Sequence, residues 1–226
     1  MSKKILFAWS SGKDSALALY EIRKTPRYEI VALLTTVTKD YDRISMHGVR
    51  RVLLEQQAAS LGLPLEKVLI TKNSSNEEYE ARMKDKLMEY QSRGVSAVAF
   101  GDIFLEDLKK YRENNLAKIE WQALFPIWKR DTVELSRSFV KLGFKAIITC
   151  VDSKVLDKSF VGRAYDEDFL KDLPPAIDPC GENGEFHSFA FAGPVFKEKI
   201  SFTIGEIVLR DNRFYFCDLM PTELKE

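Results

Sequence analysis

The chain has 226 residues, 45% of them hydrophobic and 30% charged, which suits one large domain or one domain with a small appendage. Lys plus Arg and Asp plus Glu number 34 each, which argues against a global field that would hold the chain on nucleic acid or on an anionic membrane. No apolar run approaches the roughly 20 residues of a membrane span, and the first residues show no secretory signal, so we expect a cytoplasmic protein.

The first predicted strand and the loop after it form the most informative segment. Residues 5–9 are apolar, as is typical of a buried parallel strand, and a helical pattern begins at residue 16. Between them stands Ser-Ser-Gly-Lys-Asp-Ser, residues 10–15. Backbone N–H groups at the helix start, together with the Lys13 charge, favour a bound phosphate. The alternative is an ordinary strand-to-helix turn in which Asp14 or Ser15 caps the helix.

Strands and helices then alternate as far as residue 151. Further strands are predicted at residues 30–34, 68–70, 95–100, 121–125 and 146–151. The helices between them end at glycines that suit left-handed C-caps, namely Gly62, Gly94 and Gly143. This alternation predicts an α/β domain over residues 1–151, with a doubly wound parallel sheet and a ligand site at the carboxyl ends of its strands.

The pattern changes after residue 151. Prolines interrupt residues 174–179, and strand patterns follow at residues 186–191, 200–210 and 214–219. Asp211-Asn212 is a plausible hairpin turn between the last two, and residues 200–204 alternate as if one face were buried. We predict a small α+β subdomain over residues 152–226 that covers the active end of the sheet.

A second polar segment, Cys-Gly-Glu-Asn-Gly-Glu-Phe-His at residues 180–187, precedes the first of these strands. If strand alternation begins at Glu185, then Glu185 and His187 share one face. A carboxylate beside an imidazole offers acid–base chemistry. The alternative is a tight turn at Asn183-Gly184 with solvated charges.

The cysteines and histidines do not indicate a metal centre. Cys150, Cys180 and Cys217 are far apart and show no C-x-x-C spacing, so structural zinc and a disulfide framework are not expected. Cys150 and Cys217 are expected to be buried in strands. The two histidines of the chain are too few for a convincing metal site.

Residues 10–15 and 180–187, together with Gly101-Asp102-Ile103 and Pro126-Ile127-Trp128, resemble segments of the diphthine–ammonia ligase family of N-type (PP-loop) ATP pyrophosphatases. The resemblance extends from residue 4 to about residue 192. It implies an adenine nucleotide alpha hydrolase-like fold and MgATP as cosubstrate. It also implies that a carboxylate is adenylated and then amidated by ammonia, with release of AMP and pyrophosphate.

The resemblance also suggests roles for individual residues. ATP would contact the first loop and the end of the second strand, at Ser10, Ser11, Gly12, Lys13, Asp14, Ser15, Leu34 and Thr35. Catalysis would fall to Lys13, Asp102, Glu185 and His187. The acceptor would be held by His47 and Arg50, from a segment that begins at Met46, and by Glu182, Asn183, Gly184, Glu185 and His187. Asp14 would hold Mg²⁺ or cap its helix, and Asp102 would bind Mg²⁺, orient the acceptor or cap the next helix.

Two departures from the family pattern are visible. Ser11 stands where members typically carry glycine, and a serine is tolerated there if its φ is negative. Asn183 replaces a glycine, and His187 with Ser188 replaces a Glu-Thr pair. These later changes concern the acceptor more than the ATP chemistry.

The expected partners are ATP, ammonia and a carboxylate acceptor, which a protein could carry, and a homo-oligomer stays open. Free ammonia or a partner would supply the nitrogen, because we expect neither a glutaminase domain nor a nucleophilic cysteine. One alternative is a tRNA-modifying PP-loop adenylating enzyme, against which the balanced charge argues. The other is a regulatory module that binds ATP or AMP without turnover.

Overall fold

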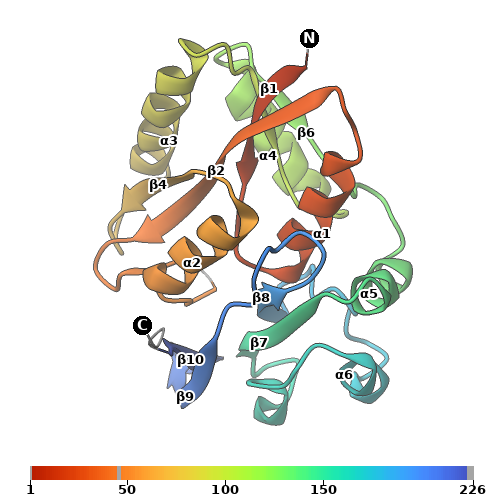
Figure 1. Cartoon of the computed structure of the whole chain (residues 1–226). Coiled ribbons are helices and arrows are strands. Elements are labelled where there is room, and N and C mark those ends of the chain that lie inside the picture. Colours follow the sequence, from red (N-terminus) through yellow and green to blue (C-terminus); the bar gives the residue numbers. More distant parts are fainter. Residues whose placement is uncertain (1, 45–46, 223–226) are drawn as a thin grey trace.

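The first sheet is built mainly from parallel strands (Figure 1). The computed structural model describes residues 2–44 and 47–222. Within them the parallel strands are β1 (Lys3–Ala8), β2 (Tyr28–Thr38), β4 (Leu65–Ile70), β5 (Ala97–Ala99) and β6 (Gln122–Leu124). The short β3 (Arg43–Ile44) pairs antiparallel with the end of β2. From β1 the chain adds β2 and β4 on one side and β5 and β6 on the other, so β1 and β5 flank the switch point where such sheets bind ligands.

Helices cover both faces of this sheet. Helices α1 (Lys13–Arg23) and α2 (Arg51–Leu61) pack with one set of buried strand residues. Helices α3 (Asn76–Gln91) and α4 (Glu106–Ala117) pack with the other set. The predicted left-handed cap at Gly62 is confirmed, with φ of 68°, because only glycine adopts this geometry without strain. The predicted doubly wound α/β architecture is confirmed as well.

Four antiparallel strands form the second sheet, in the order β8-β7-β10-β9. They are β7 (Lys145–Asp152), β8 (Phe186–Ala192), β9 (Phe202–Arg210) and β10 (Phe214–Pro221), accompanied by α5 (Thr132–Lys141), the 3₁₀ turn η1 (Lys158–Phe160) and α6 (Glu167–Asp172). We expected residues 146–151 in the parallel sheet, and this assignment is wrong. Strand β7 is buried along nearly its whole length as a central antiparallel strand, and such a strand reads like a buried parallel one. A domain boundary after residue 151 stays a prediction.

The β9–β10 hairpin has the tight turn that the sequence predicts, but it lacks the buried strand face that the sequence predicts. Asp211 and Asn212 both have positive φ, 51° and 49°, as predicted for a tight hairpin turn. Ile204, however, is 54% exposed, so the expected buried face of residues 200–204 does not continue along the strand. Strand β9 lies at the edge of its sheet, where little of the chain covers it.

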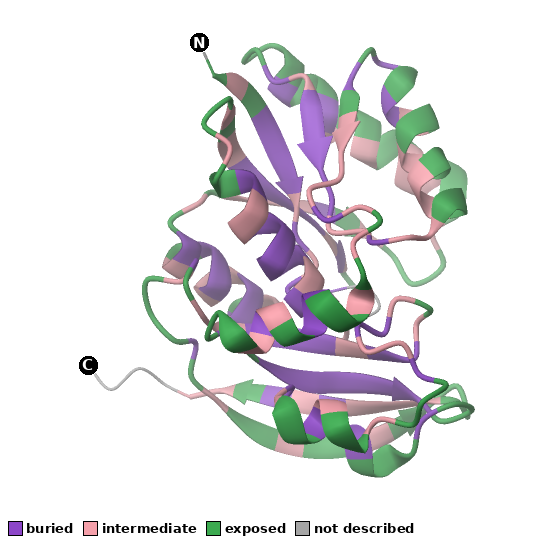
Figure 2. Ribbon diagram, turned by 90° about the vertical axis from the view of Figure 1, so that its right-hand side faces the viewer, coloured by how far each residue is buried: buried purple, intermediate pink, exposed green. Residues whose placement is uncertain are grey.

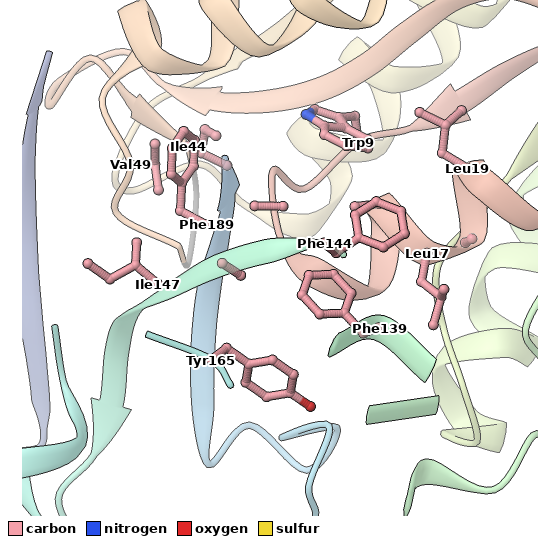
Figure 3. Packing of buried hydrophobic residues seen from close by; sticks show 14 of the residues in the cluster. Trp9, Leu17, Leu19, Ile44, Val49, Phe139, Phe144, Ile147, Tyr165 and Phe189 are labelled. Atoms are coloured by element: carbon pink, nitrogen blue, oxygen red, sulfur yellow. The ribbon is translucent and has the colours of Figure 1, made fainter. Parts of the chain in front are cut away.

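The two sheets share one hydrophobic core. Trp9 follows β1, and its ring lies 6.3 Å from those of Phe7 and Phe196. Leu17 and Leu19 of α1 and the rings of Phe139 and Phe144 belong to the same cluster (Figure 3). Residues of β7 and β8, including Ile147 and Phe189, complete the cluster. The backbone N–H of Ala190 donates to the Ser11 carbonyl at 2.9 Å. The second sheet therefore lies against the loop that follows β1.

Burial follows this arrangement (Figure 2). Buried residues run along the central strands of both sheets, whereas the edge strand β9 and the outward faces of the helices are largely exposed. Cys150 of β7 and Cys217 of β10 are both buried, as predicted. No helix in the described part of the chain is sufficiently long and apolar to span a membrane.

Candidate active site

In the loop of residues 10–15, the small polar groups form hydrogen bonds with one another and with β8. The Ser10 and Ser15 hydroxyl oxygens lie 3.1 Å apart. The Gly12 N–H donates to Ser10 Oγ at 3.3 Å, and the Lys13 N–H donates to Ser188 Oγ of β8 at 3.2 Å. Gly12 occupies the N-cap position of α1 without a side-chain cap, so neither Asp14 nor Ser15 caps this helix. The capping role that the alternative gave to Asp14 or Ser15 is therefore wrong.

Ser11 adopts a left-handed conformation, with φ of 70°. The condition under which the sequence tolerates a serine here, a negative φ, is therefore not met. Ser11 is fully buried, and its Oγ has no hydrogen-bond partner among the described residues. Such a conformation destabilises any residue except glycine by about 1–2 kcal/mol.

Gln57 of α2 holds this strained turn in place. Its amide nitrogen donates to the carbonyls of Ser11 and Ala190, at 3.1 and 2.5 Å, and its oxygen accepts from Trp9 Nε1 at 2.9 Å. Gln57 is not among the site residues expected from the sequence. The available signal was a polar side chain on the apolar face of α2, next to Leu53, Leu54, Ala58 and Leu61.

The Lys13 side chain is buried and fully engaged. Its ammonium contacts both Asp14 carboxylate oxygens, at 2.8 and 3.0 Å, and the Cys180 carbonyl. The rings of Tyr165 and Phe186 lie 5.4 and 5.2 Å from it. Burial acts to lower the pKa of Lys13, but the charge and hydrogen bond of Asp14, together with Cys180 and Glu182, outweigh burial and the pKa is raised. The lysine therefore stays protonated, and its charge is available at the loop.

A cleft of about 960 Å³ opens at the carboxyl ends of β1, β2 and β5. It collects most of the residues selected from the sequence: Ser10, Lys13, Asp14, Ser15, Leu34, Thr35, His47, Asp102, Glu182, Asn183, Gly184 and His187. Four others lie outside its lining: Ser11, Gly12, Arg50 and Glu185. Two segments about 170 residues apart in sequence thus face one space, as a two-substrate site requires.

Glu182 connects the two sides of this cleft. Its Oε1 accepts from the backbone N–H groups of Ile103 at 2.7 Å and Phe104 at 3.4 Å, in the loop after β5. Burial, and then the nearby Asp14 charge, raise the pKa of Glu182 to about 7. A carboxyl with such a pKa exchanges protons near neutral pH, as acid–base groups in active sites do.

Glu185 does not face the cleft beside His187. Strand β8 begins at Phe186, so Glu185 belongs to the preceding turn and the expected shared face is not formed. Its Oε1 accepts from the Asp178 N–H at 3.2 Å and from Asn183 Nδ2 at 3.0 Å. Glu185 therefore shapes the turn that presents Glu182 and Asn183.

His47 and His187 meet at the wall of the cleft, with ring centroids 4.7 Å apart. His47 Nδ1 lies 3.2 Å from the Ser188 carbonyl. A carbonyl only accepts, so Nδ1 carries the proton and Nε2 keeps its lone pair. Burial lowers the pKa of His47 to about 4, and burial together with the nearby His47 lowers that of His187 to about 3. Both imidazoles are neutral at pH 7.

Two predicted site residues are engaged in ion pairs. Arg50 donates to both carboxylate oxygens of Asp218 on β10, at 3.0 and 2.6 Å, instead of lining the cleft. Asp102 accepts from Arg112 of α4 at 2.5 and 3.1 Å. The N-cap of α4 is Leu105, so the alternative that Asp102 caps this helix is wrong. Met46 lies outside the described residues.

Helices α3 and α4 contribute a wall that the sequence did not indicate. Glu80 of α3 accepts from the Tyr111 hydroxyl and from Lys118, both at 3.1 Å, and these side chains line the cleft. The two helices lie on the same face of the sheet but are separated in sequence by residues 92–105, so local sequence could not reveal that they share a cleft wall.

Carboxylates on the cleft are spread out. Among residues 2–44 and 47–222, no three His, Cys, Asp or Glu side chains form a group that could hold a metal ion. Asp14 nevertheless reaches the cleft, with 30% of its side chain exposed. One carboxylate with nucleotide phosphates is a common way to bind Mg²⁺.

Comparisons with known proteins agree across the chain. The family model "diphthamide synthase N-terminal domain" matches residues 3–119, and "diphthamide synthase C-terminal domain" matches residues 131–219. A diphthine–ammonia ligase of Danio rerio is 28% identical over 228 residues, which cover 90% of this chain and 88% of that protein. Those of Schizosaccharomyces pombe and Homo sapiens are 26% and 31% identical, over 91% and 51% of this chain. These matches span 37% and 45% of the two longer proteins.

Proposed function

The chain belongs to the diphthamide synthase family, and on that premise we propose that it is an ATP-dependent ligase that forms AMP and pyrophosphate. The substrate carboxylate would be adenylated and then amidated by ammonia. The relatives are ligases by name, and that name supports diphthine as the acceptor and ammonia as the nitrogen donor. The observation that carries the proposal is the single cleft shared by the 10–15 loop and the 180–187 segment.

The position of the 10–15 loop supports phosphate binding. The loop lies at the switch point of the parallel sheet and at the N-terminus of α1, where the helix dipole favours an anion. The Gly12 and Lys13 N–H groups now donate to serine hydroxyls, and phosphate oxygens would be stronger acceptors for them. The β- and γ-phosphates would occupy this loop, with adenine near Leu34 and Thr35 at the end of β2.

In the first step, a carboxylate oxygen of the acceptor attacks the α-phosphorus of ATP. The bond from this phosphorus to the bridging oxygen breaks, and that oxygen leaves with pyrophosphate. Negative charge grows on the leaving group, and the protonated Lys13 would stabilise it. The Asp14 contact keeps the lysine charged before ATP binds.

Asp14 is the residue that would hold Mg²⁺. Its carboxylate lies on the cleft beside the proposed phosphate site, which is the donor type and setting that this ion prefers. The bound ion would neutralise phosphate charge.

In the second step, ammonia attacks the acyl carbon and AMP leaves. The nitrogen must lose a proton, and Glu182 is placed on the cleft to accept it, with a pKa of about 7. The neutral His47 and His187 would line the acceptor pocket without carrying charge. Asn183 and Gly184, on the turn held by Glu185, would complete it.

The test is to incubate the protein with MgATP, ammonium and a diphthine-bearing acceptor, with simple carboxylic acids and tRNA as comparators. We expect AMP, pyrophosphate and amide in equal amounts, and only with a carboxylate acceptor. Formation of ADP and phosphate would contradict the proposal. AMP formed only with tRNA would favour a tRNA-modifying enzyme, and binding of ATP without any AMP would favour a regulatory module.

A further inference from the structure

Two arginines at the ends of the segment 43–50 share one aspartate of the second sheet. Arg43 Nη1 lies 2.8 Å from Asp218 Oδ1. Arg50 reaches the same carboxylate with Nε at 3.0 Å from Oδ1 and Nη2 at 2.6 Å from Oδ2. We call these three residues the Asp218 cluster. The hydrogen bonds of Arg50, and then those of Arg43, help to lower the pKa of Asp218 to about 2, so the carboxylate is charged at neutral pH.

The described residues of this segment form hydrogen bonds with one another and contact β10. Arg43 Nη1 also donates to the Gly48 carbonyl at 2.7 Å, and the Ile44 N–H donates to the Val49 carbonyl at 2.9 Å. Gly48 has φ of +68°, and a Cβ there would lie 2.8 Å from the Phe216 ring. The backbone at Gly48 thus lies directly against the Phe216 side chain of β10.

His47 stands between these anchors and contacts the 10–15 loop. Its Cε1 lies 2.9 Å from the place that a Cβ on Gly12 would take, and its Nδ1 is bonded to the Ser188 carbonyl. Ser188 also receives the Lys13 N–H. Asp218 itself does not line the cleft. A continuous set of contacts thus leads from β10, through the arginines and His47, to the loop.

We propose that Asp218 is a positioning residue for the nucleotide site, because by holding Arg43 and Arg50 it fixes His47 against the 10–15 loop. The second sheet then determines the shape of the loop, although Asp218 touches neither the loop nor the cleft. The part that concerns ATP rests on the proposed function, whereas the part that concerns His47 does not.

Imidazole NMR tests the His47 part directly. The chain has two histidines, so ¹⁵N-labelled histidine gives two imidazole signals, which His187→Asn assigns. In the unchanged protein we expect His47 to be the Nδ1–H tautomer and to stay neutral down to about pH 5, because it is buried and lies near Lys13. Asp218→Asn and Arg50→Gln should change the His47 signals and move its titration towards that of a free histidine. Asp218→Glu, which keeps the charge, should restore much of the original behaviour.

Arg213→Gln is the matched control. Arg213 pairs with Asp152 of the same sheet, and its side chain is 45% exposed, against 41% for Arg50. This variant loses an ion pair of the second sheet without touching the segment 43–50. We expect its His47 signals and its ATP affinity to match those of the unchanged protein. The Asp218→Asn variant should bind MgATP about 5-fold or more weakly, as measured by calorimetry.

Three results would overturn the proposal. The His47 signals could be unchanged in Asp218→Asn and Arg50→Gln, or they could change equally in Arg213→Gln, which would indicate general loosening of the sheet. His47 could also respond while ATP affinity stays the same, which would remove the link to the nucleotide site. If the unchanged protein binds no ATP, the proposed function fails, and the NMR result still decides whether Asp218 positions His47.

Discussion

Ser11→Gly should stabilise the protein, although glycine usually weakens a fold. The substitution removes a left-handed strain of about 1–2 kcal/mol and a buried hydroxyl without a partner, whose burial costs about 1–3 kcal/mol. Against this stand about 0.5–1 kcal/mol of backbone entropy and about 0.8 kcal/mol of lost side-chain burial. The net gain in the free energy of unfolding is about 2 kcal/mol, or about 4–8 °C in Tm for a chain of this length.

The assay is chemical and thermal unfolding without nucleotide, and Ser11→Ala separates the two causes. Alanine removes the hydroxyl but keeps a buried Cβ in the left-handed conformation, so in the glycine variant the relieved strain is offset by the entropy and burial costs, and the two variants should be about equally stable. An alanine variant more stable than the glycine variant by about 1.5 kcal/mol, as expected at a position without strain, would refute the strain argument. A glycine variant less stable than the unchanged protein would refute the account of the turn as a whole.

Three further predictions concern the cleft. Lys13→Ala should lower the rate of AMP release about 100- to 1,000-fold, because the leaving pyrophosphate loses its cation. Lys24→Ala, at the exposed end of α1, should change this rate little. Equal rates of AMP release in the two variants would contradict the role of Lys13. Gly101→Ala should slow AMP release by up to about 100-fold, because the Cβ of the new alanine would lie 3.0 Å from the Ser15 backbone and displace the start of α1. An unchanged rate of AMP release would show that this close approach is dispensable. Glu182 has a folded pKa of about 7, above its ordinary 4.5, so its contribution to stability is full below pH 4.5 and is lost as the pH rises to 7. Urea unfolding should therefore show Glu182→Gln gaining stability relative to the unchanged protein between pH 4.5 and 8, and parallel pH profiles would contradict the raised pKa.

Local signals were sufficient for much of this fold. Apolar runs identified the strands, and Gly62 ended its helix where the left-handed cap predicts. Chain order alone could not place β7, because its burial on both faces suits a central strand of either sheet. The exposure of Ile204 was likewise invisible, since the sequence does not say which strand forms the edge.

The candidate site was predictable in its parts more than in its geometry. Small residues around Lys13 indicated an anion loop, and that loop does open onto the cleft. The roles of Glu185 and Arg50 depend on contacts with Asp178 and Asp218, which only the folded chain supplies. Gln57 shows the same limit, because its hydrogen bonds join three separate segments.

The proposed function depends most on where the phosphates of ATP bind. A crystal structure with α,β-methylene-ATP, in which the bond to be broken is replaced, tests this directly. We expect the β- and γ-phosphates at the N–H groups of residues 11–13, with the Lys13 ammonium turned towards them. A polyphosphate chain bound anywhere else in the cleft, with the 10–15 loop left to its serine hydroxyls, would contradict the central claim.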